Sequence, residues 1–362
     1  MFIESLLDLA LQIQQIPAPT FDEARRADFV RARLVAEGLS DVQVDSTGNV
    51  LARLPGKGTG LPLVVTAHLD TVFPPEMDLA SRREAGKIIA PGLGDNALGV
   101  AALFGISWQL RERKATLPCD LWFVANVGEE GLGDLRGMRA VVDRFGGKVK
   151  GYLVVEGLAF GHVYNRGTGV RRFRITVHSS GGHSWTDFGK PSAIHELAAL
   201  VTRITALELP EEPRTTLNVG RVSGGTSINT IAPEAWMELD LRSEDEAALR
   251  DLVKRVEELI SAANQPGVSL ETTMIGNRPA GRILPDHPFI RSAMSCLREQ
   301  GVDPSLTIGS TDANVPFSRG YPAVVLGVTT GGGAHTVNEF IDLPPIEKGI
   351  AQLVEFIIHA SK

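Results

Sequence analysis

Residues 61–70 read LPLVVTAHLD, a short apolar run that ends in a histidine and an aspartate. DNALGVAALFGISWQLRER (95–113) follows, with apolar residues at helical spacing, and then a second apolar run, DLWFVANV (120–127). Such runs are typical of strands buried on both faces of a parallel sheet, and the segment between them suits a crossover helix. The three segments therefore predict an α/β fold with a mostly parallel sheet flanked by helices.

The rest of the chain extends this pattern in both directions. GYLVVE (151–156) and PAVVLGV (322–328) predict two further buried strands. Before residue 61 we expect an amphipathic helix, a proline-rich turn at residues 16–19 and a second helix over about 22–37, and we expect a last helix over about 345–359. Asp95 stands where the N-cap of the 95–113 helix would be.

A different pattern begins near residue 168. RRFRITVHS (171–179), TTLNVGRV (215–222) and WMELDLRS (236–243) alternate apolar with polar residues, as half-buried antiparallel strands do. Two helical patterns interleave with them, and Ser243 with Glu246 makes a capping-box spacing before the second. The sequence predicts a small α+β domain over 168–277, inserted into a larger domain formed by 1–167 and 278–362.

Composition narrows the class of protein. The 362 residues carry a net charge of −7, which gives no electrostatic reason to expect nucleic acid or an anionic membrane as a partner. Cys119 and Cys296 are too few for a disulfide framework. Glu4 and Asp8 stand where a signal peptide would be basic, and no apolar window approaches 18 residues. We expect a cytoplasmic protein that acts on small molecules.

Histidines and carboxylates follow the apolar runs or lie in glycine-rich loops. Ligands of open α/β sheets bind outside the carboxyl ends of the strands, so these side chains should converge. Histidine nitrogen and carboxylate oxygen are ligand types that zinc accepts. The sequence therefore predicts a two-metal hydrolase. The residues are His68, Asp70, Asp95, Glu129, Glu130, Glu156 and His335.

Simple geometry suggests roles for some of them. Residues two apart on a strand face one way, so the Asp70 carboxylate can accept a hydrogen bond from the ring of His68. The two oxygens of Asp95 could hold two divalent ions ~3.5–4 Å apart, although a plain N-cap is the alternative. Glu129 and Glu130 would face opposite ways, one as a ligand and one as general base; the alternative is a solvated acidic turn.

The order of these motifs along nearly the whole chain resembles a known family. HLD (68–70), GDN (94–96), the paired glutamates, EG (156–157), GGH (181–183) and GGGAH (331–335) are similar to motifs of the dizinc exopeptidases, which include glutamate carboxypeptidase, aminoacylase, succinyl-diaminopimelate desuccinylase, carnosinase and peptidase T. The resemblance implies that His68 and Glu156 bind one ion, that Glu130 and His335 bind the other, and that Asp95 bridges both. Zn²⁺ is the expected metal, with Co²⁺ or Mn²⁺ as alternatives.

The resemblance also implies the remaining roles. Glu129 would be the general base acting on a water or hydroxide between the ions, and Asp70 would orient His68. The inserted domain would form a homodimer and close as a lid, with His183 reaching across the dimer to the tetrahedral oxyanion; read alone, His183 is a turn histidine. Substrate contacts are implied for Asn229, Arg242 and Gly332.

The substrate stays open at this point. Glu156, where some members have Asp, favours carboxypeptidase, deacylase or desuccinylase chemistry, whereas RPAG (278–281) and STDAN (310–314) are similar to peptidase T. We expect amide hydrolysis in small peptides or N-acyl amino acids, carboxypeptidase type favoured over deacylase, desuccinylase or aminopeptidase. The presence of Glu129 argues against a non-catalytic metal- or ligand-binding relative, and GLGDNALG (92–99) lacks the full spacing of a nucleotide-binding loop.

Overall fold

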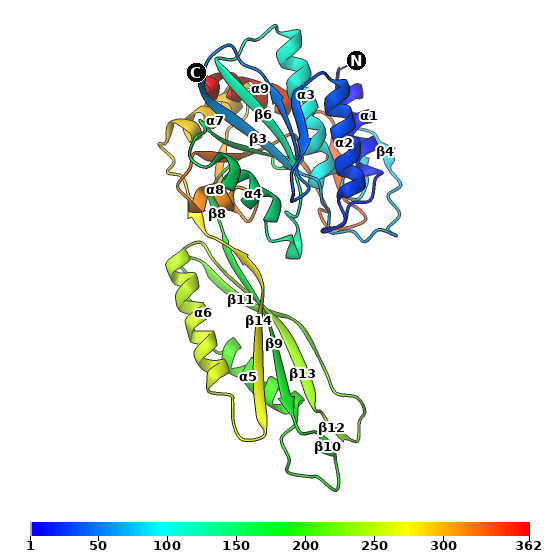
Figure 1. The fold of residues 1–362 in the computed structure, drawn as a ribbon, viewed down its shortest axis with the longest axis vertical. Coiled ribbons are helices and arrows are strands. Elements are labelled where there is room, and N and C mark those ends of the chain that lie inside the picture. Colours follow the sequence, from blue (N-terminus) through cyan, green and yellow to red (C-terminus); the bar gives the residue numbers. More distant parts are fainter. Residues whose placement is uncertain (1) are drawn as a thin grey trace. The chain divides into compact units, whose positions relative to one another are not determined.

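The computed structural model describes residues 2–362 (Figure 1). The chain divides into two compact units, one made of the residues up to Gly167 together with Arg282–Lys362, and the other of Thr168–Gly281. The sequence analysis places the return to the larger unit at residue 278. In the structure the return comes at Arg282, because the strand that ends at Arg278 belongs wholly to the inserted unit.

The larger unit is built on one mixed sheet in the order β1-β2-β6-β3-β7-β17-β8-β15, with β16 paired to β8. The central pairs β6·β3, β3·β7 and β7·β17 are parallel, and β1·β2, β2·β6 and β17·β8 are antiparallel. The predicted α/β fold with a mostly parallel sheet is confirmed. The strands are β1 (Ser40–Val44), β2 (Val50–Leu54), β3 (Gly60–His68), β6 (Cys119–Asn126), β7 (Gly151–Glu156), β8 (His162–Gly167), β15 (Gly281–Arg282), β16 (Ser305–Gly309) and β17 (Ala323–Gly327).

Helices flank this sheet and complete its core. Helix α3 is buried along most of its length, which explains why it is apolar on nearly every face. Phe289 and Phe356 join α7 to α9 through an edge-to-face contact with ring centroids 4.8 Å apart. Among residues 2–362, no helix is both long and apolar enough to cross a membrane. The helices are α1 (Phe2–Gln14), α2 (Ala24–Ala36), α3 (Leu98–Glu112), α4 (Arg136–Phe145), α7 (Pro288–Glu299), α8 (Asn314–Ser318) and α9 (Ile346–Ser361).

The start of α3 differs from the expectation. The helix begins at Leu98, and Asp95 lies in the preceding turn Leu93–Ala97 with φ −121° and ψ 86°, outside the helical region. The N-cap is Ala97, so the alternative interpretation of Asp95 as a plain N-cap is wrong. The Asp95 carboxylate instead faces two histidines, as described below.

A small second sheet in the larger unit has the order β18-β19-β5-β4. Its strands are β4 (Arg82–Glu84), β5 (Lys87–Ile89), β18 (Gly331–Gly332) and β19 (Phe340–Asp342). The loop that carries His335 connects β18 to β19, so the hairpin fixes both ends of this loop. The sequence analysis did not predict this sheet, whose strands are only two or three residues long.

The inserted unit is an antiparallel sheet in the order β11-β13-β9-β14, with α5 and α6 packed on it. Its other face is charged, for example through the ion pair Arg172–Asp240 at 2.9 Å. The N-cap of α6 is Asp245, which accepts hydrogen bonds from two backbone N–H groups, so the capping box predicted for Ser243 is wrong. The elements are β9 (Gly169–Ser179), β10 (Gly182–His183), α5 (Ala193–Thr205), β11 (Thr215–Gly224), β12 (Thr230–Ile231), β13 (Glu234–Ser243), α6 (Glu246–Ser261) and β14 (Val268–Arg278).

Candidate metal centre

Three neighbouring strands deliver their ends to one place. Strand β3 lies between β6 and β7, and all three run parallel, so their carboxyl ends meet at one edge of the sheet. His68 is the last residue of β3 and Glu156 the last of β7, while Glu129 and Glu130 follow β6. Three of these side chains are buried and therefore shielded from solvent: those of His68, Glu129 and Glu130.

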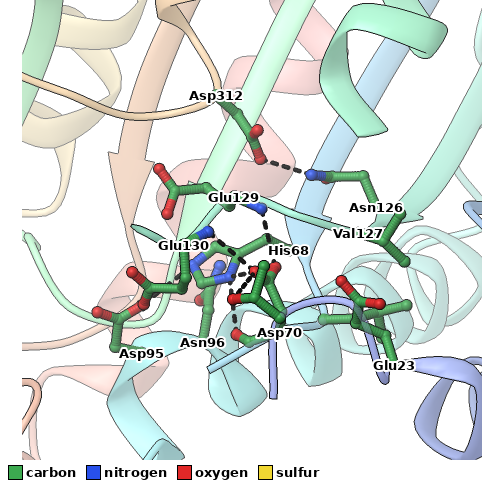
Figure 2. Close-up of polar contacts among 12 residues, drawn as sticks. Glu23, His68, Asp70, Asp95, Asn96, Asn126, Val127, Glu129, Glu130 and Asp312 are labelled. Atoms are coloured by element: carbon green, nitrogen blue, oxygen red, sulfur yellow. Dashed lines mark hydrogen bonds and ion pairs between the residues drawn. The ribbon is translucent and has the colours of Figure 1, made fainter. Parts of the chain in front are cut away.

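Asp95 lies between two imidazole rings. Its Oδ1 is 3.0 Å from Nε2 of His68, and its Oδ2 is 3.1 Å from Nε2 of His335 (Figure 2 shows the side of His68). A second carboxylate flanks each ring: Glu156 Oε2 lies 3.7 Å from the His68 Nε2, and Glu130 Oε1 lies 3.3 Å from the His335 Nε2. Each oxygen of Asp95 therefore belongs to a different histidine–carboxylate cluster.

The side chains predicted as metal ligands come together in this arrangement. One group of potential ligand atoms, all within 4.8 Å of one another, comes from His68, Asp95 and Glu156, and another from Asp95, Glu130 and His335. The two groups share Asp95. The same limit also holds for His68, Glu129 and Glu130, so the spacing of atoms alone allows Glu129 to be either a ligand or a base.

The electrostatics of the centre favour bound positive charge. Burial lowers the pKa of His68, but hydrogen bonds to the surrounding carboxylates, first that of Asp70, outweigh burial and raise the pKa well above its ordinary value. Asp95 and Glu130 raise the pKa of His335 to about 10. Burial opposes the ionisation of Asp95, yet the two imidazoles hold its pKa below the ordinary value. The carboxylates thus create a negative potential that would stabilise a proton on an imidazole or a bound divalent cation.

The loop of His335 is shaped for this contact. His335 has φ 66°, in the left-handed region that residues other than glycine rarely occupy, and its side chain is 54% exposed. Left-handed backbone at such a residue persists only where its surroundings hold it. Here the β18–β19 hairpin and the contact with Asp95 provide that restraint.

Asp70 holds the chain that carries the paired glutamates. Its Oδ1 accepts the backbone N–H of Glu129 and its Oδ2 that of Glu130, both at 2.9 Å (Figure 2), and Oδ2 also accepts the Thr20 hydroxyl at 2.9 Å. The ring Nδ1 of His68 lies 3.1 Å from the Asp70 carbonyl oxygen and 3.6 Å from its Oδ1. The closest partner of Nδ1 is therefore the carbonyl oxygen of Asp70, while the Asp70 carboxylate mainly fixes the glutamates.

The predicted substrate residues of the inserted unit do not all lie together. His183 on β10 pairs with Thr230 on β12, and the Asn229 carbonyl accepts the N–H of Ser184 at 3.0 Å, so His183 and Asn229 are neighbours. Arg242 pairs with Val170 at the opposite end of β9 and donates to Asp240 at 2.6 Å. Gly332, in the larger unit, pairs with Phe340 next to the His335 loop.

Comparison with known proteins identifies the family. The model of the peptidase family M20/M25/M40 matches residues 64–359. The chain belongs to this family. The resemblance read from the sequence is confirmed, and the chain is an enzyme of the metallopeptidase and amidohydrolase type.

Individual members of the family show how far the likeness extends. Succinyl-diaminopimelate desuccinylase of Corynebacterium glutamicum is 26% identical over 359 residues, which cover 96% of this chain and 95% of that protein. A tripeptidase from Staphylococcus aureus has a TM-score of 0.84 at 23% identity and covers 99% of this chain and 98% of that one. The aminopeptidase PepT from Bacillus cereus has a TM-score of 0.81 at 23% identity and covers 99% of each chain. The two structures share the fold.

Glu339 supports the centre, although the sequence analysis did not find it. Its carboxylate is fully buried and accepts the backbone N–H groups of Gly92 at 3.0 Å, Gly94 at 2.7 Å and Asp95 at 2.9 Å. A Cβ at Gly94 would lie 3.2 Å from Glu339 Oε1 and 2.9 Å from Leu158 side-chain atoms, which explains the glycine. Burial raises the pKa of Glu339 to about 7. Glu339 thus ties the loop of His335 to the turn of Asp95.

We expect Glu339→Gln to weaken metal binding by about 10–100-fold, the loss typical of removing an outer-shell partner. An amide offers one acceptor oxygen in place of two, so at least one N–H of the Asp95 turn loses its partner. Calorimetric titration with Zn²⁺ measures the effect. Glu347→Gln, on the first turn of α9, is the control and should bind metal as the wild type does. Unchanged affinity in Glu339→Gln would contradict the assignment.

Two asparagines complete the surroundings of the centre. Asn96 donates to the Val155 carbonyl at 2.9 Å and accepts the Gly157 N–H at 2.7 Å, which fixes the Asp95 turn to the end of β7. Asn126 at the end of β6 donates to the buried Asp312 at 2.7 Å (Figure 2). Burial raises the pKa of Asp312 to about 7. These contacts anchor the strand ends from which the candidate ligands project.

Proposed function

We propose that this chain hydrolyses an amide bond in a small peptide or an N-acyl amino acid, using two divalent metal ions and Glu129 as general base. The observation that carries the proposal is the position of Asp95, whose two oxygens face different imidazoles 3.0 and 3.1 Å away. A screen of dipeptides and N-acyl amino acids, with and without chelator, tests it. Chelator-sensitive release of an amino acid supports the proposal, and inertness of the metal-loaded protein toward the whole panel counts against it.

The donor set fits two divalent ions. His68, Asp95 and Glu156 would hold one ion, and Asp95, Glu130 and His335 the other, which matches the two clusters of ligand atoms. When bound, the ions would polarise the scissile carbonyl and lower the pKa of an attacking water toward ~7. Imidazole and carboxylate ligands suit Zn²⁺, which we propose as the metal, and Co²⁺ or Mn²⁺ would fit the same donors.

Glu129, held in place by Asp70, would transfer the proton of the attacking water. Glu129 is 6% exposed, and its backbone N–H is fixed by Asp70, so its carboxylate is held in a defined place. We assign it to accept the proton of the attacking water and to pass that proton to the leaving nitrogen. Asp70, which is fully buried, would act by positioning Glu129 and Glu130 rather than by touching the substrate.

His183 is assigned to stabilise the oxyanion of the tetrahedral intermediate. The backbone N–H groups of Trp185 and Thr186 point at its Nδ1, at 3.2 and 3.4 Å. A ring nitrogen that accepts N–H groups carries no proton, so the proton lies on Nε2, which is left as a donor. A preformed donor of this kind is suited to negative charge that develops in the transition state.

We expect His183→Ala to lower kcat by about 10²–10³-fold, the loss typical of one oxyanion donor, with metal content unchanged. Steady-state kinetics and elemental analysis of the same preparation check this. His195→Ala removes another exposed histidine of the inserted unit, on α5, and serves as the control with wild-type turnover. Wild-type turnover in His183→Ala would remove this residue from the mechanism.

The type of amide is a finer proposal. Glu156, where some members have Asp, favours carboxypeptidase, deacylase or desuccinylase chemistry, and of these we favour the carboxypeptidase type. The desuccinylase of Corynebacterium glutamicum matches almost the full length of the chain and so supports the alternative, deacylation of N-acyl amino acids. The substrates preferred in the screen would separate the two, and release of the amino-terminal residue from a tripeptide would instead indicate an aminopeptidase.

We also propose that the active form is a homodimer joined through the inserted unit. Strand β11 lies at the edge of its sheet, where backbone groups are free to pair with another chain. It exposes Val222 beside the half-exposed Ile194 of α5, and both side chains line one apolar hollow. An apolar surface next to a free strand edge is suited to a second copy. Asn229, Arg242 and Gly332 remain proposed substrate contacts.

A further inference from the structure

The most exposed large apolar side chains of residues 2–362 gather at one tip of the inserted unit. Trp185 is 84% exposed, Phe188 is 90% exposed, and Ile228 is fully exposed. The first two follow β10 and the third precedes β12, and these two strands pair with each other. Exposed apolar residues that cluster in this way mark a surface that binds something apolar.

The tip is held in one conformation by its own hydrogen bonds. Asp187 accepts the backbone N–H of His183 at 2.8 Å and forms an ion pair with Lys190 at 2.7 Å. The Asp187 N–H in turn donates to the His183 carbonyl at 2.9 Å. Trp185 and Phe188 are therefore presented on a braced turn. Rigid aromatic residues give a large apolar contact area and lose little entropy on binding.

Exposed apolar residues also accompany the metal centre in the larger unit. Val72 is 42% exposed, Leu132 53% and Val337 56%, and each lies two positions beyond one of the candidate site residues. Exposed apolar side chains thus lie close in sequence to candidate site residues in each unit. Lys190, the cation nearest the tip in the sequence, is already paired with Asp187.

We propose that Trp185 and Phe188 select the substrate, and that the substrate carries a bulky apolar side chain or acyl group next to the scissile amide. The inference rests on the proposed function, in which His183 meets the reacting carbonyl. Trp185 and Phe188 lie two and five residues beyond His183 on the same braced turn, so a carbonyl that His183 contacts would bring its flanking groups to these rings. Burying aliphatic or aromatic groups against such rings is favourable, whereas burying a second carboxylate there is not.

The test is a substrate series measured on the metal-loaded full chain. Dipeptides and N-acetyl amino acids vary from glycine to leucine to phenylalanine beside the scissile bond, and N-succinyl amino acids supply the charged members. We expect kcat/KM of the wild type to rise at least about tenfold from glycine to the bulky apolar members. Trp185→Ala and Phe188→Ala should remove this rise, so that the bulky apolar members lose at least about tenfold relative to the glycine members.

Matched variants separate selection from other roles. Met274→Ala truncates a half-exposed apolar side chain on β14 of the same unit and should keep the selectivity. Trp185→Phe preserves a ring and should keep most of it. The thermal midpoint and the oligomeric state of each variant are measured alongside and should match the wild type, because the truncated side chains are exposed.

Several outcomes would overturn the inference. A wild type that prefers glycine or succinyl substrates would contradict it, and so would alanine variants that keep the apolar preference. An equal loss on every substrate, or a change of oligomeric state, would assign the rings to positioning His183 or to an interface between copies. In each of these cases amides are still hydrolysed, so the proposed function stands. Only inertness toward the whole series would remove both.

Discussion

Replacing Glu129 by glutamine is expected to lower kcat by about 10²–10⁴-fold while the protein keeps two metal ions. Glutamine has nearly the same shape as glutamate but cannot accept a proton. The backbone N–H of Glu129 still reaches Asp70, so the local chain should stay in place. Single-turnover kinetics together with elemental analysis of the same sample measure the two quantities.

Glu130→Gln is the matched control, because Glu130 is adjacent and also buried. Its oxygen lies 3.3 Å from His335, and we expect this variant to lose metal affinity as well as rate. If Glu129→Gln lost an ion, Glu129 would belong among the ligands, an arrangement that its closeness to His68 and Glu130 allows. A normal rate in Glu129→Gln would exclude Glu129 as the base.

Asp95→Ala should have the largest effect on metal content, with loss of both ions and of all measurable turnover. Asp95 belongs to both clusters, so its removal would take a ligand from each proposed ion and would remove a negative charge that screens the repulsion between the ions. We expect affinity to fall by more than the ~10–100-fold typical of an outer-shell change. Metal content after gel filtration and calorimetric titration measure this.

Asp28→Ala is the control, since its side chain is 72% exposed on α2 and far in sequence from the site residues. It should retain both ions and the normal rate. Stable retention of one ion by Asp95→Ala would place Asp95 in a single metal site and contradict the proposed bridging role. Retention of both would remove it from the ligand set.

The parts of the fold that were predictable are those with a continuous apolar signal. Strands β3, β6, β7 and β17 are buried on both faces, and their continuous apolar sequences indicate this burial. Strand β8 alternates buried and more exposed residues over six positions and pairs in opposite senses with β16 and β17, so no single pattern marks it. The small sheet has strands too short to show periodicity.

The candidate site was predictable where a residue follows a strand. His68 and Glu156 end strands, so their convergence follows from the order of a parallel sheet. For Asp95 the sequence pattern alone also allowed a helix cap, and the GDN motif favoured the bridging position. The conformation of its turn directs the carboxylate toward the two histidines. Glu339 was missed because its contacts, 244–247 positions away, are with backbone N–H groups, which leave no mark in the sequence.

The central claim is that this chain holds two metal ions that are required for amide hydrolysis. The most direct measurement is a titration of chelator-treated protein with Zn²⁺, in which bound metal and the rate on the best substrate of the screen are followed together. The account predicts that binding saturates at two ions per chain and that the rate returns as they bind. A rate that survives the chelator unchanged, or a protein that binds no Zn²⁺, would contradict it.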